Sequence, residues 1–303
     1  MAQPARSRVQ VLTYLVLVFL FSSLFYFLML HGGGIRAGGG VYTLCLMWCP
    51  ALAGMLTLRL NGRSLSDLGW KWKGNYQFWS WLIPILYAGI AYIIIWTTGL
   101  GGFGNPQYLS AVAARAHFTG PHWLALLLGF ILIAAYGLIG SLSSALGEEI
   151  GWRGFLVPEL SRTFSFTLTS IISGLVWSVW HYPILIYGGY NNGTPTWYDL
   201  TCFTVMVVSM SFVFAWMRLK SGSLWTGAML HASHNLYIQG ILTPITIDTG
   251  KTKWYIDEFG CVVPLVAIVF AIYFWSKRRE LPAQPAASSD PVTSVHDTVP
   301  ARA

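Results

Sequence analysis

Charged residues are scarce in this chain. Asp and Glu together number 11 and Lys and Arg 18, so 10% of the 303 residues are charged while 55% are hydrophobic. Soluble globular domains carry about 25% charged residues. A chain with so few charges cannot cover a normal water-exposed surface, which argues against an ordinary soluble protein and favours one that lies in lipid.

The sequence also has few cysteines, and its cations do not gather into one basic stretch. The four cysteines, Cys45, Cys49, Cys202 and Cys261, form no C-x-x-C pair, which argues against a zinc knuckle and a disulfide framework. The net charge of +7 comes from short clusters of Lys and Arg between apolar runs. We therefore expect no nucleic-acid partner and attribute the cations to membrane orientation.

Long apolar runs are what the sequence has in abundance. A transmembrane helix needs about 17–25 mainly apolar residues. Runs of that kind lie near 11–31, 41–58, 78–98, 123–146, 165–187, 199–217, 223–243 and 260–276. They predict an all-α polytopic integral membrane protein of about eight helices, with a single transmembrane domain over residues 1–280.

The distribution of cations predicts the orientation of these helices. Half of them follow the second, sixth and last apolar runs: Arg59, Arg63, Lys71 and Lys73; Arg218 and Lys220; Lys277, Arg278 and Arg279. Cation-rich loops usually lie on the cytoplasmic side of a membrane, which places both termini in the cytoplasm. The compact loops suggest a bacterial cytoplasmic membrane. The segment 281–303, rich in Pro, Ala and Ser, is expected to be a disordered tail.

A pair of glutamates stands at the end of the fourth apolar run. Charges at membrane depth are costly and usually face a water-filled cavity, which makes them candidates for function. The stretch 147–154 reads G-E-E-I-G-W-R-G. Glu149 and Arg153 are four residues apart and are expected to form a buried ion pair that fixes this helix. Glu148 is left without an obvious local partner.

Two later helices carry histidines. His181 lies late in an apolar, aromatic run, and His231 and Asn235 are four residues apart in another. Residues at that spacing share one face of a helix. His234, on the same run, is expected to be a structural hydrogen-bond donor between helices.

Simple geometry predicts that Glu148 and His181 meet inside the bilayer. With a turn near residues 161–163, they lie about 18 Å and roughly 27 Å from that turn along their helices, at 1.5 Å per residue. The helix must then continue past Glu148 to about Leu160. We therefore expect the fourth span to be broken or kinked around Gly147.

With these residues in place, the chain resembles the CAAX protease and bacteriocin-processing (CPBP, or Abi) family of intramembrane proteases over about residues 142–241. The family pattern is E-E-x-x-x-R, F-x-x-x-H and H-x-x-x-N or D on three separate helices. The matching residues are Glu148, Glu149 and Arg153; His181; and His231 with Asn235. Trp177 stands where the pattern usually has Phe, an exchange expected to affect packing more than chemistry.

The resemblance implies a protease-like domain in which Glu148 is the general base that activates a water molecule. His181 and His231 either orient that water or join Glu148 in a metal site, most plausibly for zinc, with one position open for water. The sequence leaves both alternatives open. Asn235 is implied to donate its amide to the developing oxyanion.

The implied partners are membrane lipid and a protein or peptide substrate, with prenylated proteins of the CaaX type among the candidates. Two other functions compete with proteolysis. A non-catalytic immunity or scaffolding protein of the same fold would bind a peptide without cleaving it. A transporter would use the buried acid and histidines as a proton relay and would favour inverted repeats, which the two halves of the sequence do not show.

Overall fold

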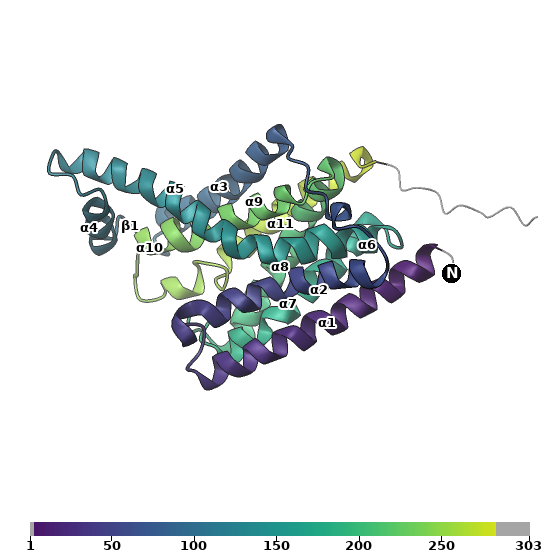
Figure 1. The fold of residues 1–303 in the computed structure, drawn as a ribbon. Coiled ribbons are helices and arrows are strands. Elements are labelled where there is room, and N and C mark those ends of the chain that lie inside the picture. Colours follow the sequence, from purple (N-terminus) through teal and green to yellow (C-terminus); the bar gives the residue numbers. More distant parts are fainter. Residues whose placement is uncertain (1–2, 283–303) are drawn as a thin grey trace, which may run out of the picture.

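The computed structural model describes residues 3–282, so the predicted tail lies outside the described residues except for its first two. The chain folds into a bundle of long helices (Figure 1). The α-helices are α1 (Gln3–His31), α2 (Val41–Leu60), α3 (Gly74–Thr97), α4 (Pro106–Arg115), α5 (His122–Glu149), α6 (Val157–Ser161), α7 (Phe166–Tyr187), α8 (Thr196–Ser221), α9 (Trp225–His234), α10 (Thr243–Ile245) and α11 (Val262–Ser276).

Shorter elements connect or extend these helices. The 3₁₀ turns are η1 (Ala37–Gly40), η2 (Leu65–Leu68), η5 (Thr252–Trp254) and η6 (Lys277–Glu280), and the π-helical segments are η3 (Ile150–Leu156) and η4 (Asn235–Leu242). Two strands, β1 (Gly102–Phe103) and β2 (Thr246–Ile247), pair antiparallel. This small ladder was not predicted, and it ties the loop after α3 to the end of α10.

The predicted all-α polytopic membrane architecture is confirmed. Within residues 3–282, six helical runs are long and apolar enough to cross a membrane. The seventh and eighth predicted spans correspond to the run α9–η4–α10 and to α11, which do not meet the same length and hydropathy criteria. The exact number of crossings and the inward orientation of both termini stay predictions.

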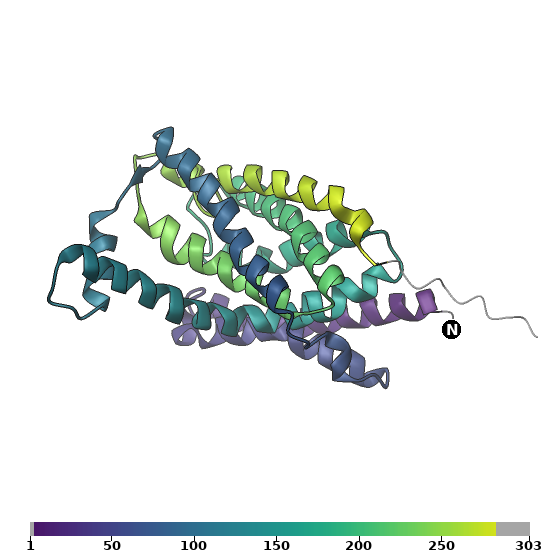
Figure 2. The same ribbon diagram turned by 90° about the horizontal axis from the view of Figure 1, so that it is seen from above.

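Helix α9 occupies the centre of the bundle. It packs against α3, α5 and α8, while α7 and α11 pack on the other faces of α8. Figure 2 shows the first half of α5 extending away from this core, with α4 beside it. The second half of α5, α7 and α9 carry the three sequence motifs, so the packing of these helices brings the motifs together.

The fourth span differs from the prediction in where it becomes irregular. It runs as one helical stretch from 122 to 161, past Leu160 as expected, but it is not broken at Gly147. Instead it widens into the π-helical segment η3, directly after Glu149. Gly147 instead allows the helix to pack closely against α2, because a β-carbon there would lie 2.7 Å from the carbonyl oxygen of Met47.

The widened segment leaves one backbone carbonyl without a helical partner. The N–H of Val157 donates to the carbonyl of Trp152, five residues back, and Pro158, the next residue, has no N–H to offer. The carbonyl of Arg153 is instead bound by the Nε of Arg218 on α8, at 2.7 Å. A buried carbonyl that lacks a hydrogen bond is costly, so this buried arginine has a structural role.

Gly151 allows the motif helix to approach α2 closely. A β-carbon at this position would lie 2.5 Å from both the Cβ and the carbonyl oxygen of Pro50, and 2.5 Å from the hydroxyl of Tyr14. Small residues at such contacts let membrane helices pack backbone to backbone. The contact sets the depth at which Glu148, on the same helix, is held.

We expect Gly151→Ala to destabilise the protein, because the backbone of α2 cannot yield to the added methyl group. Overpacking of this kind costs about 1–3 kcal/mol. Thermal unfolding in detergent measures the effect. Gly140→Ala is the matched control, since a β-carbon at Gly140, on the same helix, meets nothing within 4 Å. Equal unfolding temperatures for the two variants would contradict this account of Gly151.

Candidate active site

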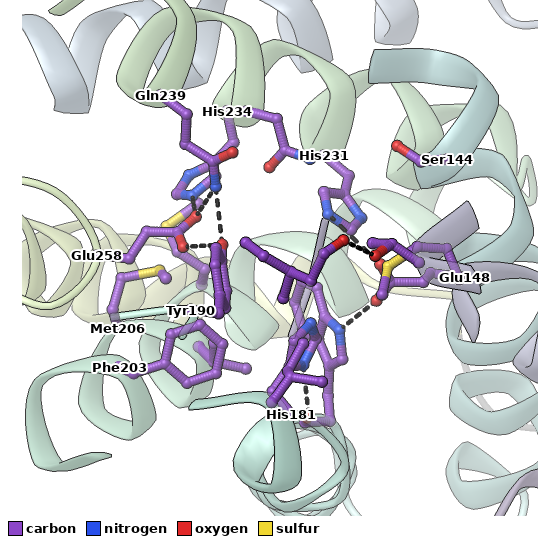
Figure 3. A pocket seen from close by; sticks show the side chains of 18 of the residues that line it. Ser144, Glu148, His181, Tyr190, Phe203, Met206, His231, His234, Gln239 and Glu258 are labelled. Atoms are coloured by element: carbon purple, nitrogen blue, oxygen red, sulfur yellow. Dashed lines mark hydrogen bonds and ion pairs between the residues drawn. The ribbon is translucent and has the colours of Figure 1, made fainter. Parts of the chain in front are cut away.

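The three motifs converge on one internal cavity of about 210 Å³. Glu148 from α5, His181 from α7, His231 from α9 and Asn235 at the start of η4 all line it (Figure 3). The predicted meeting of Glu148 and His181 is therefore confirmed. Much of the remaining wall is apolar, formed by aliphatic, aromatic and methionine side chains of α7 and α8. Such a wall separates the polar groups from bulk water.

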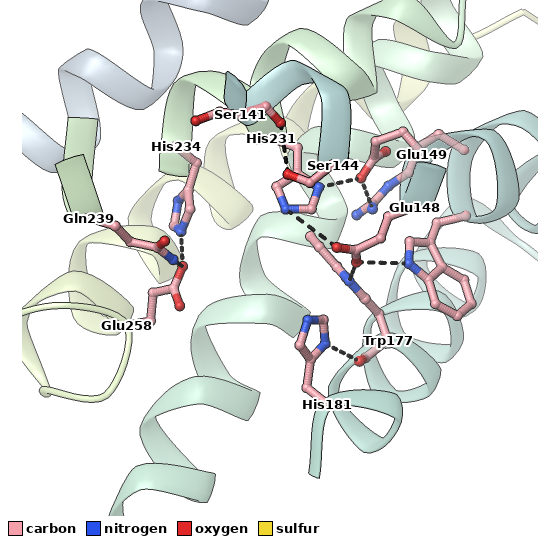
Figure 4. Close-up of polar contacts among 12 residues, drawn as sticks. Ser141, Ser144, Glu148, Glu149, Trp177, His181, His231, His234, Gln239 and Glu258 are labelled. Atoms are coloured by element: carbon pink, nitrogen blue, oxygen red, sulfur yellow. Dashed lines mark hydrogen bonds and ion pairs between the residues drawn. The ribbon is translucent and has the colours of Figure 1, made fainter. Parts of the chain in front are cut away.

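The carboxylate of Glu148 is held from one side by two indole groups. Its Oε2 accepts a hydrogen bond from Nε1 of Trp177 at 2.7 Å and a longer one from Nε1 of Trp152 at 3.3 Å. Its Oε1 lies 4.0 Å from Nε2 of His231, beyond hydrogen-bond distance (Figure 4). The side chain is 2% exposed. One oxygen is therefore fixed by the protein, and the other is left to interact with a molecule in the cavity.

Trp177 makes a polar contact in addition to the packing that was expected of it. Phenylalanine has no hydrogen-bond donor, whereas the indole N–H of Trp177 makes the shorter of the two bonds to Glu148. The exchange therefore adds a direct contact with the candidate base. The sequence carried this signal, because Trp is a donor wherever it is buried.

Glu149 and Arg153 lie behind the cavity wall and form the predicted ion pair. Nη1 of Arg153 contacts Oε1 of Glu149 at 2.7 Å, and both side chains are almost fully buried. The guanidinium also lies between the rings of Trp177 and Phe214, 4.2 Å and 4.0 Å from their centroids. Removing one partner of such a buried pair typically costs about 3–5 kcal/mol. The pair holds the helix that carries the candidate base.

Hydrogen bonds also fix the orientation of both histidines. Nδ1 of His181 lies 3.0 Å from the carbonyl oxygen of Trp177, and Nδ1 of His231 lies 3.1 Å from Oε1 of Glu149. A carbonyl or a carboxylate only accepts, so in each ring Nδ1 carries the proton. When a ring is neutral, its Nε2 is then an acceptor. In that form, each ring offers its Nε2 lone pair to a molecule in the cavity.

The donor atoms needed for a metal are of the right type but are not gathered closely. Glu148, His181 and His231 are the ligand types of a catalytic zinc site. Within residues 3–282, no three His, Cys, Asp or Glu side chains are grouped tightly enough to hold a metal ion. As they stand, these side chains do not fit a resident metal, which favours the metal-free one of the two alternatives that the sequence leaves open. A chelator can test whether zinc binds.

Asn235 differs from the other motif residues because its amide is free. Among the described residues, no hydrogen bond joins its side chain to another group, although it lines the cavity. It stands at the junction where α9 widens into η4. Its N–H groups are therefore available to a ligand in the cavity.

A second polar cluster, which sequence reasoning missed, lines the same cavity. Glu258, from the loop before α11, contacts Nε2 of His234, Nε2 of Gln239 and the hydroxyl of Tyr190. His234 also forms a hydrogen bond with the hydroxyl of Tyr87 on α3, so it does link two helices. One feature of the sequence could have indicated Glu258, because it is an acid next to the start of the last apolar run. No local pattern indicated that its loop folds back into the bundle.

Comparison with known proteins agrees with this geometry. Residues 130–237, which contain all six motif positions, match the family model of Rce1-like type II CAAX prenyl endopeptidases. A CAAX prenyl protease 2 of Methanococcus maripaludis is 33% identical over 139 residues, 44% of this chain and 47% of that protein. The chain thus spans about half the length of this relative. Over these residues, the chain is therefore similar to the CAAX prenyl endopeptidases that its motifs resemble.

Proposed function

We propose that this protein is an intramembrane endopeptidase that hydrolyses peptide bonds of membrane-associated substrates with water activated by Glu148. The observation that carries the proposal is the state of that carboxylate. Two indole N–H groups hold one of its oxygens, while the other faces a buried cavity with two imidazole acceptors. This is the arrangement that general-base catalysis requires.

The hydrogen-bond inventory suggests how a water molecule is oriented. A water between Glu148 and a histidine donates one hydrogen to Oε1 of Glu148 and the other to a histidine Nε2, because both atoms are acceptors. One of its two lone pairs then points toward the substrate. Glu148 takes one proton as the water oxygen bonds to the scissile carbonyl carbon.

The remaining steps use groups already in the cavity. Negative charge develops on the carbonyl oxygen, where the free amide of Asn235 donates a hydrogen bond. The C–N bond then breaks, and the proton held by Glu148 passes to the departing amine. Water is consumed, one carboxylic acid and one amine are formed, and the side chain of Glu148 returns to its starting state.

The substrate class is inferred from the relatives and from the setting of the cavity. The matching family and the Methanococcus maripaludis protein are named for CAAX prenyl substrates. A prenylated carboxyl terminus places its peptide at the membrane, within reach of a site enclosed by transmembrane helices. We therefore propose prenylated CaaX-type proteins as substrates, in a bacterial cytoplasmic membrane.

The proposal is tested with purified protein in detergent and a panel of matched peptides, each made with and without a prenyl group. Reactions are run in ¹⁸O-labelled water, with and without a chelator, and the products are identified by mass spectrometry. We expect cleavage of the prenylated members, one ¹⁸O atom in the new carboxylate and no effect of the chelator.

Glu148→Ala, purified in the same way, shows whether the activity belongs to this protein. Cleavage that persists in the variant would remove Glu148 as the base. Tight peptide binding without cleavage by the wild type would support the immunity or scaffolding alternative instead. Loss of activity with the chelator would call for a metal that the side chains gather only when it binds.

We expect Trp177→Phe to lower kcat by roughly tenfold to a hundredfold, the range for a hydrogen bond to a charged group. Phenylalanine keeps an aromatic ring beside Arg153 but removes the donor to Glu148. The base then loses its shorter anchor while the substrate contacts remain, so KM is expected to change little. Steady-state kinetics on the best-cleaved peptide measure both constants.

The matched control for this variant is Trp180→Phe. Trp180 lies on the same helix and donates a bond of the same length, 2.7 Å, to the hydroxyl of Ser22 and not to Glu148. The Trp180→Phe variant is expected to unfold at a lower temperature without a comparable loss of kcat. Equal kcat values for Trp177→Phe and the wild type would return Trp177 to a packing role.

A further inference from the structure

The cavity has two polar ends. Figure 3 shows Glu148, His181 and His231 on one side, and His234, Gln239, Tyr190 and Glu258 on the other. The side chains of Phe203, Met206 and Val207 belong to the apolar wall of the same cavity. The proposed chemistry uses only the first end. The second consists of buried or half-buried polar groups that serve no step described so far.

Within this second end, the orientation of the Gln239 amide is determined. Its Nε2 donates to Oε1 of Glu258 at 3.0 Å and to the hydroxyl oxygen of Tyr190 at 2.9 Å. The Tyr190 hydroxyl gives its own proton to Oε2 of Glu258 at 2.5 Å, so its oxygen is free to accept. Both partners act as acceptors, which places the NH₂ group of Gln239 toward them.

This orientation leaves the carbonyl oxygen of Gln239 as an unused acceptor. No hydrogen bond to that atom occurs within residues 3–282, although Gln239 is half-buried and lines the cavity. Glu258 is itself fixed by Nε2 of His234 at 2.5 Å. A rigid acceptor in a cavity is suited to a ligand N–H group, because its orientation is set before the ligand arrives.

Gln239 follows Asn235 by four residues on the same helical run, and both line the cavity. In an α-helix, side chains at that spacing are about 5–6 Å apart at their β-carbons, and in this π-helical segment the two side chains still share one side, since both line the cavity. An extended peptide repeats its orientation every two residues, about 6.6 Å at 3.3 Å per residue. The two amides are therefore spaced to meet one strand of peptide, with Asn235 at the scissile carbonyl and Gln239 about two residues away.

From this geometry we infer a backbone-recognition subsite. The side-chain carbonyl of Gln239 accepts a hydrogen bond from one main-chain N–H of the substrate, about two residues from the scissile bond. Glu258, Tyr190 and His234 hold the amide in position. The subsite fixes which bond of an extended peptide reaches Glu148, whatever the side chains of the substrate. This inference rests on the proposed peptidase activity and adds the register of the substrate to it.

The test is a set of substrate peptides in which one amide at a time, away from the scissile bond, is replaced by an ester. Each replacement removes a single N–H. Wild type is expected to lose about tenfold in kcat/KM at one position, the size of one hydrogen bond. Gln239→Met, of similar length but without an acceptor amide, is expected to cleave the ester and amide forms of that peptide equally well.

Gln107→Met is the matched control, since Gln107 lies on α4 and does not line the cavity. It should keep the wild-type ester penalty. If Gln239→Met does not purify in a folded form, Gln239→Asn, which retracts the amide by one methylene, takes its place with the same expectation. An ester penalty of equal size in the wild type and the Gln239 variant at every position overturns the inference. Absence of Glu148-dependent cleavage of the all-amide parent peptide would instead overturn the proposed function.

Discussion

Replacing Glu148 by glutamine is expected to reduce kcat by about 10²–10⁴-fold, the usual contribution of a general base. Glutamine keeps the shape of the side chain, and its oxygen can accept the same bonds from Trp177 and Trp152. Its amide then faces Nε2 of His231, to which it can donate. The fold is therefore expected to persist while the ability to take a proton from water is lost. Initial rates over a substrate range, together with thermal unfolding, measure the two effects separately.

Glu159→Gln separates loss of the base from loss of any buried acid. Glu159 lies on the same helical run, is 1% exposed and contacts Arg63 and Arg162, but it does not line the cavity. We expect this variant to unfold at a lower temperature and to keep its kcat. A Glu148→Gln protein that cleaves as fast as Glu159→Gln would mean that another group activates the water.

Asn235→Ala is expected to lower kcat by about 10²–10³-fold, as the loss of one oxyanion donor does in other acyl-transfer sites. The reason is that its amide is free in the resting protein and meets its partner only when charge develops on the substrate. For the same reason the substitution leaves no buried group unpaired, so stability should change little. Steady-state kinetics and thermal unfolding give both quantities.

Asn191→Ala provides the contrast for this prediction. The amide of Asn191 is already engaged with the carbonyl of Leu185 at 3.1 Å, outside the cavity lining. Its loss is expected to affect stability and not kcat. If Asn235→Ala instead raised KM at constant kcat, Asn235 would bind the substrate in its ground state and would not stabilise the oxyanion.

The sequence was informative where a physical rule is strictly local. Apolar runs predicted the helices, and the spacing of Glu149 and Arg153 predicted their ion pair, because helix geometry alone determines which residues are neighbours. The convergence of Glu148 and His181 also followed from the rise per residue. The four motif residues that were expected to act together, Glu148, His181, His231 and Asn235, all line the cavity.

What the sequence did not predict depends on contacts between distant segments. After Glu149 the helix becomes π-helical, Pro158 offers no N–H, and the guanidinium of Arg218 binds the free carbonyl. No local pattern links these distant residues. The position of Glu258 depends on a loop that folds back against α9. The hydrogen bond from Trp177 to Glu148 was not predicted, because aromatic residues were treated as interchangeable surfaces, although Trp has a donor and Phe has none.

The carbonyl of Arg153 has a consequence for how the protein is made. Chains are synthesised from the N-terminus and fold progressively during synthesis. Arg218, the donor that this carbonyl uses, is 65 residues further along the chain. When the motif helix first enters the bilayer, its central turn therefore lacks a partner that will be translated only later. Insertion of α8 completes that turn, which couples maturation of the glutamate-bearing helix to the arrival of a later span.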